Sequence, residues 1–247
     1  MVNRPDIALQ IVLACHRMYG RGFVTATDGN ISARIPNGNI LVTPASLNKG
    51  QVGESDLVEV TAAGSPVTLS RKASSELSMH LFVYEHRPDV QAVVHAHPPY
   101  ATGFATARMP LPDALLPEVI LGLGTIPLAE YATPSTDEVP VSLAPFVKEA
   151  HAVLLSNHGV VTFGTSVEEA YFRMEKVEHA SHILFVARML GGEKSLTGAE
   201  LARLSEVTMG YENTSSEERS TAVDASEHTL KQLIREVLSE KLKTRGA

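Results

Sequence analysis

Apolar positions recur along the chain at two spacings, and each spacing predicts a different kind of element. In the first segment they recur every three to four residues, which predicts an amphipathic helix over about residues 4–20. Short apolar runs follow at 31–35 and 39–42, on either side of an Asn37-Gly38 step. This step favours a hairpin, because both residues tolerate positive φ. The sheet is therefore expected to be at least partly antiparallel.

A second hairpin is predicted for residues 57–60 and 66–69, around another glycine-containing turn. From Ser75 onward the pattern changes to alternating helices and strands. In chain order they are expected as helix 75–86, strand 90–95, helix 98–107, a turn-rich stretch 108–136, helix 137–150, strands 152–156 and 160–163, and helix 166–190. A central sheet covered by helices accounts for this order. We expect an α/β fold, a three-layer α/β/α domain around a mixed, largely antiparallel sheet.

The composition changes near residue 211. One more helix is expected at about 197–209, which completes a domain over residues 1–211. Residues 212–227 are mostly Ser, Thr, Glu and Asp, with little to bury, which indicates a polar linker or a disordered stretch. Apolar residues return at helical spacing in 228–243, which predicts a C-terminal amphipathic helix that docks on the body or on another subunit.

The charge balance excludes some classes of function. The 247 residues include 21 Lys and Arg and 28 Asp and Glu, a net charge of −7, which disfavours nucleic acid as a partner. No apolar run reaches the roughly 18 residues that a membrane-spanning helix requires, and no signal peptide is readable. The single cysteine, Cys15, fits a reducing compartment. We expect a soluble cytoplasmic protein.

Histidines mark the ends of two predicted strands. His95 and His97 are two residues apart in an apolar strand, so both imidazoles project to the same face. One such pair is more often a satisfied surface or core feature than a metal site. A second apolar run ends in Asn157-His158-Gly159. Three neutral imidazoles that converge at strand ends would match a catalytic zinc site, which keeps one coordination position open.

A carboxylate and three polar turns accompany the histidines. Glu76 stands at the start of a predicted helix, where Ser74 or Ser75 can cap it. Glu76 could instead be only a first-turn carboxylate favoured by the helix dipole. The backbone amides of this turn, together with those of turns 28–30 and 43–46, could bind an anion. Each feature alone is ordinary, but their combination with three histidines favours an active site.

Two further groups of side chains could carry chemistry. One group shares three- and four-residue spacing on the predicted long helix and comprises Glu175, Glu178, His179 and His182. A second metal site there would need another such helix, so a solvated or intersubunit face is favoured. The other group contains the candidates for a Schiff base, chiefly Lys49, Lys72 and Lys148. None lies within an apolar strand that would lower its pKa, so imine chemistry is disfavoured.

Five motifs together resemble the class II aldolase/adducin family over about residues 5–211. They are residues 27–34, Thr43-Pro44-Ala45-Ser46, Ser74-Ser75-Glu76 with His80, His95-Ala96-His97-Pro98 and Asn157-His158-Gly159. The resemblance implies a zinc ion held by His95, His97 and His158, with Glu76 as resting ligand and catalytic acid/base. Manganese and cobalt are the alternatives, because histidine-carboxylate sites accept several ions.

The same resemblance implies a substrate and a reaction. The substrate phosphate would be bound by Gly29, Asn30, Ala45, Ser46, Ser74 and Ser75. The expected enzyme is a metal-dependent aldolase that cleaves a ketose 1-phosphate, such as L-fuculose 1-phosphate or a 5-deoxypentulose 1-phosphate, to dihydroxyacetone phosphate and an aldehyde. A homotetramer is expected, in which Tyr211 corresponds to a C-terminal tyrosine contributed by a neighbouring subunit. Packing is the other role open to Tyr211.

Two departures from the fuculose-type members bear on the reaction. Ala45-Ser46 stands where those members have Thr-Gly, and no tyrosine occurs about twenty residues after the His-x-His motif. Leu116 occupies the ungapped position, and a two-residue shift would bring Glu118 into it as a second proton-transfer group. Glu118 could also be a simple helix-start carboxylate. The same site could therefore serve a sugar-phosphate 4-epimerase, a dehydratase or an oxo-acid phosphate decarboxylase. A non-catalytic adducin-like scaffold is disfavoured, because such a head would not need the ligands.

Overall fold

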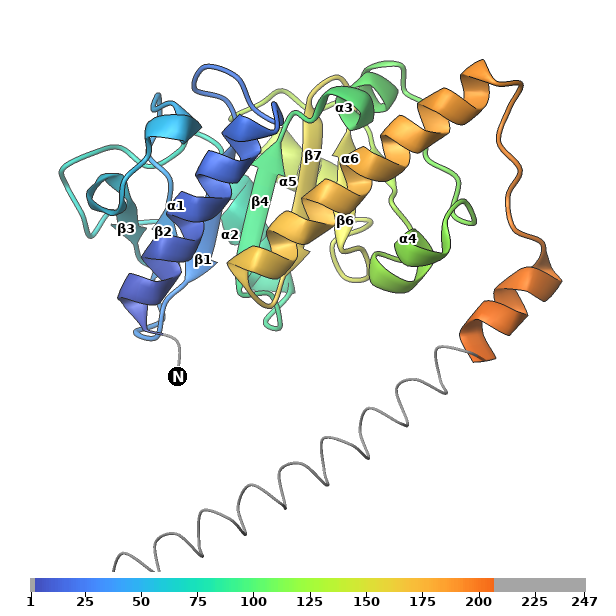
Figure 1. The fold of residues 1–247 in the computed structure, drawn as a ribbon. Coiled ribbons are helices and arrows are strands. Elements are labelled where there is room, and N and C mark those ends of the chain that lie inside the picture. Colours follow the sequence, from blue (N-terminus) through green and yellow to red (C-terminus); the bar gives the residue numbers. More distant parts are fainter. Residues whose placement is uncertain (1–2, 207–247) are drawn as a thin grey trace, which may run out of the picture. The chain divides into compact units, whose positions relative to one another are not determined.

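The computed structural model describes residues 3–206 of the chain. Its sheet has seven strands in the order β3-β2-β1-β4-β7-β6-β5 (Figure 1). The strands are β1 (Asn30–Arg34), β2 (Ile40–Val42), β3 (Val58–Val60), β4 (Ala92–Ala96), β5 (Leu128–Ala129), β6 (Ala152–Leu155) and β7 (Gly159–Gly164). All neighbours pair antiparallel except β5 and β6, which are parallel. The predicted mixed, largely antiparallel sheet is confirmed.

Helices cover both faces of this sheet, as the three-layer prediction requires. The helices are α1 (Arg4–Gly20), α2 (Leu77–His86), α3 (Pro99–Thr106), α4 (Pro117–Gly122), α5 (Glu138–Leu143) and α6 (Val167–Met189), with two short 3-10 turns at Lys49–Gln51 and Glu54–Asp56. Apolar side chains of α1, α3 and α6 form one buried core with one face of the sheet (Figure 1). Those of α2 and α5 form the second core on the other face.

Local sequence explains the first helix and the first hairpin. Asn3 caps α1 by accepting a hydrogen bond from the backbone N–H of Asp6, and the Asp6 carboxylate accepts from Asn3 N–H in return. Between β1 and β2 the chain turns at Gly38, whose φ of 85° lies in the left-handed region that glycine adopts freely. Both predictions are confirmed.

The second predicted hairpin is wrong in its second strand. Only one bridge, between Val60 and Pro66, joins the two segments. The backbone N–H groups of Val67 and Thr68 both donate to the carbonyl of Glu59, so two residues oppose one and the ladder is interrupted. Leu69 is 85% exposed and has no apolar face to pack against.

Other predicted boundaries also shift. The helix expected at 137–150 ends at Leu143, since Pro145 lacks the N–H that would continue it. The stretch 108–136, expected to consist of turns, contains α4 and β5. Pro117 begins α4, where its fixed φ suits a first helical turn.

The chain divides into two units, and the second begins at Leu196. In this second unit, a helix spans 198–206, and Thr197 and Glu200 cap it through reciprocal hydrogen bonds. The rest of the expected helix 197–209, the domain end at residue 211, the linker 212–227 and the helix 228–243 lie outside the described residues and stay predictions. Among the described residues, no helix is long and apolar enough to cross a membrane.

Candidate active site and metal centre

Antiparallel pairing brings the ends of several strands to one edge of the sheet. At this edge Asn30, which begins β1, is paired with His95 near the end of β4. Ala96 at the end of β4 is paired with Val160 near the start of β7. The turn between β6 and β7 carries His158 to the same edge. Segments far apart in sequence therefore deliver polar side chains to one place.

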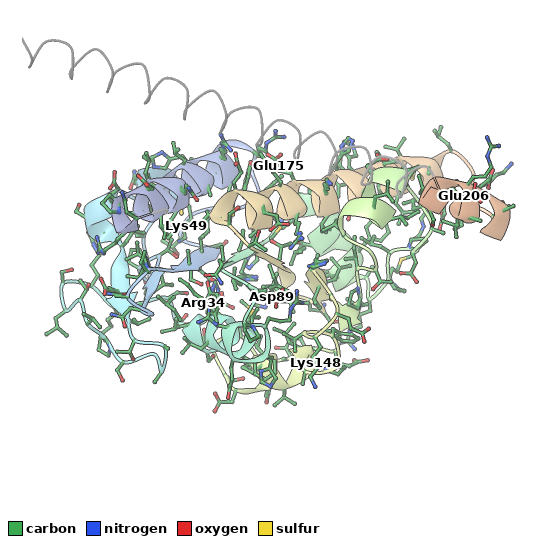
Figure 2. All side chains as sticks on the ribbon, turned by 90° about the horizontal axis from the view of Figure 1, so that it is seen from below. Arg34, Lys49, Asp89, Lys148, Glu175 and Glu206 are labelled. Carbon is green, nitrogen blue, oxygen red and sulfur yellow. The ribbon has the colours of Figure 1, made fainter. Side chains whose placement is uncertain are left out.

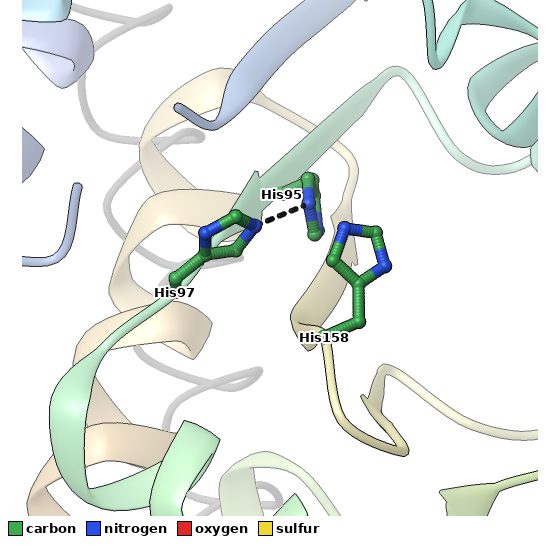
Figure 3. Close-up of side chains that lie close together, drawn as sticks. All are labelled: His95, His97 and His158. Atoms are coloured by element: carbon green, nitrogen blue, oxygen red, sulfur yellow. Dashed lines mark hydrogen bonds between the residues drawn. The ribbon is translucent and has the colours of Figure 1, made fainter. Parts of the chain in front are cut away.

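The three predicted histidines meet at this edge (Figure 3). One side-chain nitrogen from each of His95, His97 and His158 lies within 4.8 Å of the other two. The Nε2 atoms of His95 and His97 are 3.1 Å apart. His95 is fully buried, while the His97 side chain is 28% exposed, so the cluster is open toward solvent on the His97 side. Strand alternation places both imidazoles on one face, as predicted.

Glu76 completes the cluster from the start of α2. Its Oε1 lies 3.1 Å from Nε2 of His158, and its Oε2 lies 3.4 Å from Nε2 of His95. The amide of Asn30 donates a hydrogen bond of 2.8 Å to Oε2. Glu76 is itself the N-cap residue of α2, and the hydroxyl of Ser74 accepts its backbone N–H. Neither Ser74 nor Ser75 is the N-cap, so that expectation is wrong by one or two residues.

The environment keeps the imidazoles of His95 and His97 neutral and the carboxylate of Glu76 charged. Burial lowers the pKa of His95 to about 3, an effect that the charge of Glu76 opposes. Burial, and then the neighbouring His158, also lowers the pKa of His97. For Glu76 burial acts the other way, yet His95, then His158 and the Asn30 amide, hold the pKa of its carboxyl below the usual range. Neutral imidazole and ionised carboxylate are the forms that bind a metal.

The donor set fits a divalent transition metal. Nδ1 of His95 must donate to the carbonyl of Val160, 2.9 Å away, which leaves the Nε2 lone pair directed at the cluster. Oε1 of Glu76 is buried, and no hydrogen-bond partner satisfies it within the described residues. A cation among the three imidazoles would satisfy both the Nε2 lone pair of His95 and Oε1 of Glu76. Three histidine nitrogens that leave a further position to be shared by a carboxylate, water or substrate fit a catalytic zinc site.

Backbone geometry fixes the turn that carries His158. Asn157 adopts a φ of 55°, in the left-handed region that asparagine tolerates better than most residues. At Gly159 an added Cβ would lie 2.5 Å from the carbonyl oxygen of Ala96 and 2.6 Å from Cδ2 of His97. Only glycine therefore lets β7 approach the His95-x-His97 segment this closely.

The three predicted anion turns surround Glu76. Residues 43–46 and 72–74 lie side by side, since Ala45 N–H donates to Lys72 O and Ser74 N–H donates to Thr43 O. Within residues 3–206 no acceptor pairs with the backbone N–H of Gly29, Ser46 or Ser75. These amides are available to bind phosphoryl oxygens.

Two of these turns depend on left-handed backbone conformations. Gly29 adopts a φ of 70°, and a Cβ there would lie 2.5 Å from Val24 and 2.9 Å from the His95 carbonyl. Ser46 adopts a φ of 57° at the position where the fuculose-type enzymes carry glycine. Ser46 thus combines the left-handed conformation that glycine adopts freely with an added hydroxyl.

Of the two candidates for a second acid/base, only Glu118 lies among the described residues. Glu118 lies exposed in the first turn of α4, and none of the described residues forms a hydrogen bond or ion pair with it. Tyr211 lies outside the described residues. Both assignments stay predictions.

The polar residues of α6 serve other contacts. The Glu178 carboxylate accepts the backbone N–H groups of Tyr100 and Ala101, at 3.1 and 2.9 Å, and so caps α3. The Glu175 carboxylate pairs with Arg21 at 2.7 Å. His182 stacks on the ring of Tyr100. Within residues 3–206 the cluster of His95, His97 and His158 is the one group of such side chains arranged to hold a metal.

Lys49 corrects one expectation about the lysines. It is only 1% exposed, whereas Lys148 is exposed (Figure 2). Burial lowers the pKa of the Lys49 ammonium, although the lysine lies outside any strand. Its Nζ donates to the carbonyls of Thr27 and Leu47, at 3.0 and 2.8 Å, and so joins the residue before one anion turn to the residue after another. An enclosed amine with these partners cannot reach a substrate carbonyl.

No role was predicted for Ser32, His80 or Tyr84, which form a buried chain behind Glu76. The sequence gives two indications of this chain of side chains. Ser32 follows Asn30 at the two-residue spacing of a strand, and His80 and Tyr84 follow Glu76 at the four-residue spacing of a helix.

Comparisons with known proteins show what the chain is similar to. The family model described as Class II Aldolase and Adducin N-terminal domain matches residues 9–185. A 3-oxo-tetronate 4-phosphate decarboxylase from Escherichia coli is 32% identical over 194 residues, which are 75% of this chain and 89% of the relative. A 5-deoxy-D-ribulose 1-phosphate aldolase from Bacillus thuringiensis is 30% identical over 82% of this chain and 95% of its own length. A solved structure of L-fuculose 1-phosphate aldolase superposes with a TM-score of 0.76 at 30% identity, covering 85% of this chain and 98% of that one.

Proposed function

Since the chain belongs to the class II aldolase and adducin family, we propose that it is an aldehyde-lyase that cleaves a ketose 1-phosphate to dihydroxyacetone phosphate and an aldehyde. Candidate substrates are L-fuculose 1-phosphate and a 5-deoxypentulose 1-phosphate, for which two relatives at 30% identity are named. The observation that carries the proposal is the meeting of three imidazoles with Glu76, beside the backbone N–H groups of Gly29, Ser46 and Ser75, which are unpaired among the described residues.

His95, His97, His158 and Glu76 would hold the metal ion, which we propose to be zinc, with manganese or cobalt as alternatives. Cleavage between C3 and C4 leaves negative charge on the three-carbon fragment, and a bound divalent cation supplies Lewis-acid stabilisation of that charge, worth several kcal/mol. The backbone amides of Gly29, Ser46 and Ser75, with the Ser74 and Ser75 hydroxyls, hold the phosphate and so place C3 near Glu76.

Proton transfers fall to carboxylates and a phenol of this chain. The C4 hydroxyl loses its proton to Glu118, or to the phenolate form of Tyr211 from a neighbouring subunit, as the C3–C4 bond breaks. Glu76, which is ionised before substrate binds, takes the proton of the C3 hydroxyl and donates it to C3 of the three-carbon fragment, and the oxygen at C3 regains a proton from the group that took the C4 proton. The role of Tyr211 requires a homo-oligomer, proposed here as a homotetramer. Exposed apolar side chains along α6, which include Phe172, Phe185 and Met189, support association with another subunit.

Decarboxylation of an oxo-acid phosphate is the second candidate, because the E. coli relative at 32% identity is named for that activity. It would use the same cation to stabilise negative charge on carbon, with carbon dioxide leaving in place of the aldehyde. Epimerisation at C4 and dehydration share this chemistry as well. A non-catalytic scaffold is disfavoured because His95, His97, His158 and Glu76 are assembled.

A product assay by proton NMR separates these outcomes. Metal-loaded protein is incubated with ketose 1-phosphates that differ in length and terminal group. We expect two fragments, one of them dihydroxyacetone phosphate, and the loss of both metal and turnover in His97→Ala. The exposed His179 offers a matched control, and His179→Ala should keep both. An epimer, a dehydrated ketone or carbon dioxide in place of fragments would remove the lyase assignment.

A further inference from the structure

Five polar side chains form one hydrogen-bonded chain between β1 and α2. The Asn30 amide donates to Oε2 of Glu76 at 2.8 Å, and its Oδ1 lies 2.5 Å from Nε2 of His80. Nδ1 of His80 lies 2.7 Å from the hydroxyl of Ser32, which lies 2.7 Å from the hydroxyl of Tyr84. The members alternate between helix and strand, because Glu76, His80 and Tyr84 are four residues apart while Asn30 and Ser32 are two apart.

The carboxylate at one end determines the direction of every bond in the chain. An ionised Glu76 only accepts, so Asn30 must present its NH₂ group to Glu76 and its carbonyl oxygen to His80. Nε2 of His80 must therefore carry the proton, and Nδ1 must accept from Ser32. The Ser32 oxygen is then left to accept from the hydroxyl of Tyr84. All four bonds point toward Glu76.

Burying these polar side chains costs free energy unless each of them is hydrogen-bonded. Ser32 and His80 are fully buried, and Asn30 and Tyr84 are each 3% exposed. Burial also lowers the pKa of His80 to about 4, so its ring is neutral and offers one donor and one acceptor. Asn30 accepts from the donor nitrogen of His80, and Ser32 donates to the acceptor nitrogen. Buried polar groups that are fully paired hold one geometry, whereas a partly paired set is destabilising.

We propose that His80 is a positioning residue, which fixes the Asn30 amide and through it the orientation of the Glu76 carboxylate. Ser32 and Tyr84 satisfy Nδ1 of His80 in the tautomer that this task requires. The inference rests on the proposed function only for the catalytic use of Glu76.

The hydrogen-bonded chain of side chains makes the two oxygens of Glu76 different. Oε2 is held by the Asn30 amide, whereas Oε1 has no hydrogen-bond partner among the described residues and lies 3.1 Å from Nε2 of His158. Oε1 is therefore the oxygen that exchanges a proton with substrate. If the Asn30 amide were free to rotate, its carbonyl oxygen could face Oε2, and the repulsion would turn the carboxylate away.

The first test measures the imidazole tautomer by nitrogen-15 NMR on metal-free protein without substrate. We expect the neutral Nε2–H tautomer for His80, with the Nδ1 resonance moving in Ser32→Ala. The Nδ1–H tautomer would overturn the proposal. This measurement uses the unaltered chain, so it does not depend on whether a variant folds.

The second test is kinetic and uses variants of His80 and Asn30. His80→Leu should lower kcat by about 100-fold with little change in KM, because misplacement of a catalytic group by about 1 Å costs that much. His80→Gln, whose amide can donate to Asn30 and accept from Ser32, should recover most of the loss. The exposed His86 lies on the same helix, and His86→Gln should leave both constants unchanged.

A double-variant cycle separates positioning from an independent effect. If His80 acts through Asn30, adding His80→Leu to Asn30→Ala should cost no further activity. Additive losses would overturn the proposal. The expected tautomer together with no cleavage of any ketose 1-phosphate would remove the proposed function alone, while fragments formed by a protein with the other tautomer would remove the positioning role alone.

Discussion

Oε2 of Glu76 lies 3.4 Å from Nε2 of His95, although one residue is the N-cap of α2 and the other lies in β4. The contact places the ionised carboxylate of Glu76 beside the neutral imidazole of His95, whose buried Nε2 lone pair a cation would satisfy. Glu76→Gln should therefore keep the metal, which three histidines still bind, and lower kcat by about 10³-fold because the amide cannot transfer a proton. Metal analysis and kinetics on the same sample test both parts. Exposed Glu168 provides the control, and full activity in Glu76→Gln would contradict the role.

Gly159 should be irreplaceable. Its missing side chain admits the carbonyl of Ala96 and the ring of His97, and Gly159→Ala would force backbone to move by a good part of an ångström. We expect reduced metal affinity and a loss of stability of about 2 kcal/mol, in the range for overpacking. Isothermal titration with zinc and urea unfolding measure the two effects.

Gly103 in α3 is the matched control for that substitution, because a methyl group added there would meet no packed neighbour within 4 Å. Gly103→Ala should keep metal affinity and raise stability by up to about 1 kcal/mol through helix propensity. Equal effects of the two substitutions would show that the close approach at Gly159 is unimportant.

Stability of the metal-free protein should fall in mild acid. The folded-state pKa of His80 is about 4 because of burial, below the roughly 6.5 of an unfolded chain. The unfolded state therefore binds the proton first, and the free energy of unfolding decreases as the pH falls from about 6.5 to about 4. His80 contributes about 3 kcal/mol across this window, all of it present above pH 6.5.

Urea unfolding between pH 7.5 and 4.5 checks this sign. His95 adds to the slope in the same direction, so His80→Gln should reduce the pH dependence without removing it. His86→Gln changes an exposed histidine and should leave the slope as it was. A slope unaffected by His80→Gln would mean that His80 takes up its proton equally in both states.

Glu178 should contribute to stability through α3, the helix that begins two residues after His97. Its carboxylate accepts two backbone N–H groups that the proline-rich start of the helix leaves unpaired. Glu178→Ala should lower the free energy of unfolding by about 2 kcal/mol, because it removes a cap and leaves buried donors without acceptors. Chemical unfolding measures it, and Glu168→Ala, on the exposed side of α6, should change stability by no more than about 0.5 kcal/mol.

Much of the fold could be predicted from local patterns. The β1–β2 hairpin and the long helix α6 rest on period and turn chemistry, and both occur as expected. The strand expected at 66–69 and the missed strand β5 rest on tertiary context instead. Leu128 and Ala129 of β5 gain their conformation by pairing with β6, which no local spacing reveals.

The site divides in the same way. Spacing within a strand predicted that His95 and His97 share a face, and the motif pattern added His158 and Glu76. The chain from Glu76 to Tyr84 could not be predicted, because it depends on the register between β1 and α2. Likewise, nothing near Lys49 in sequence shows that Cys15 and the carbonyl of Thr27 enclose it.

The central claim is that three imidazoles and Glu76 hold one catalytic cation. X-ray diffraction at the zinc absorption edge, on crystals of zinc-loaded protein, tests it most directly. We predict a single anomalous peak per chain, about 2.0–2.1 Å from one nitrogen of each of His95, His97 and His158. A peak elsewhere, or zinc-loaded protein that shows none at these histidines, would contradict the account.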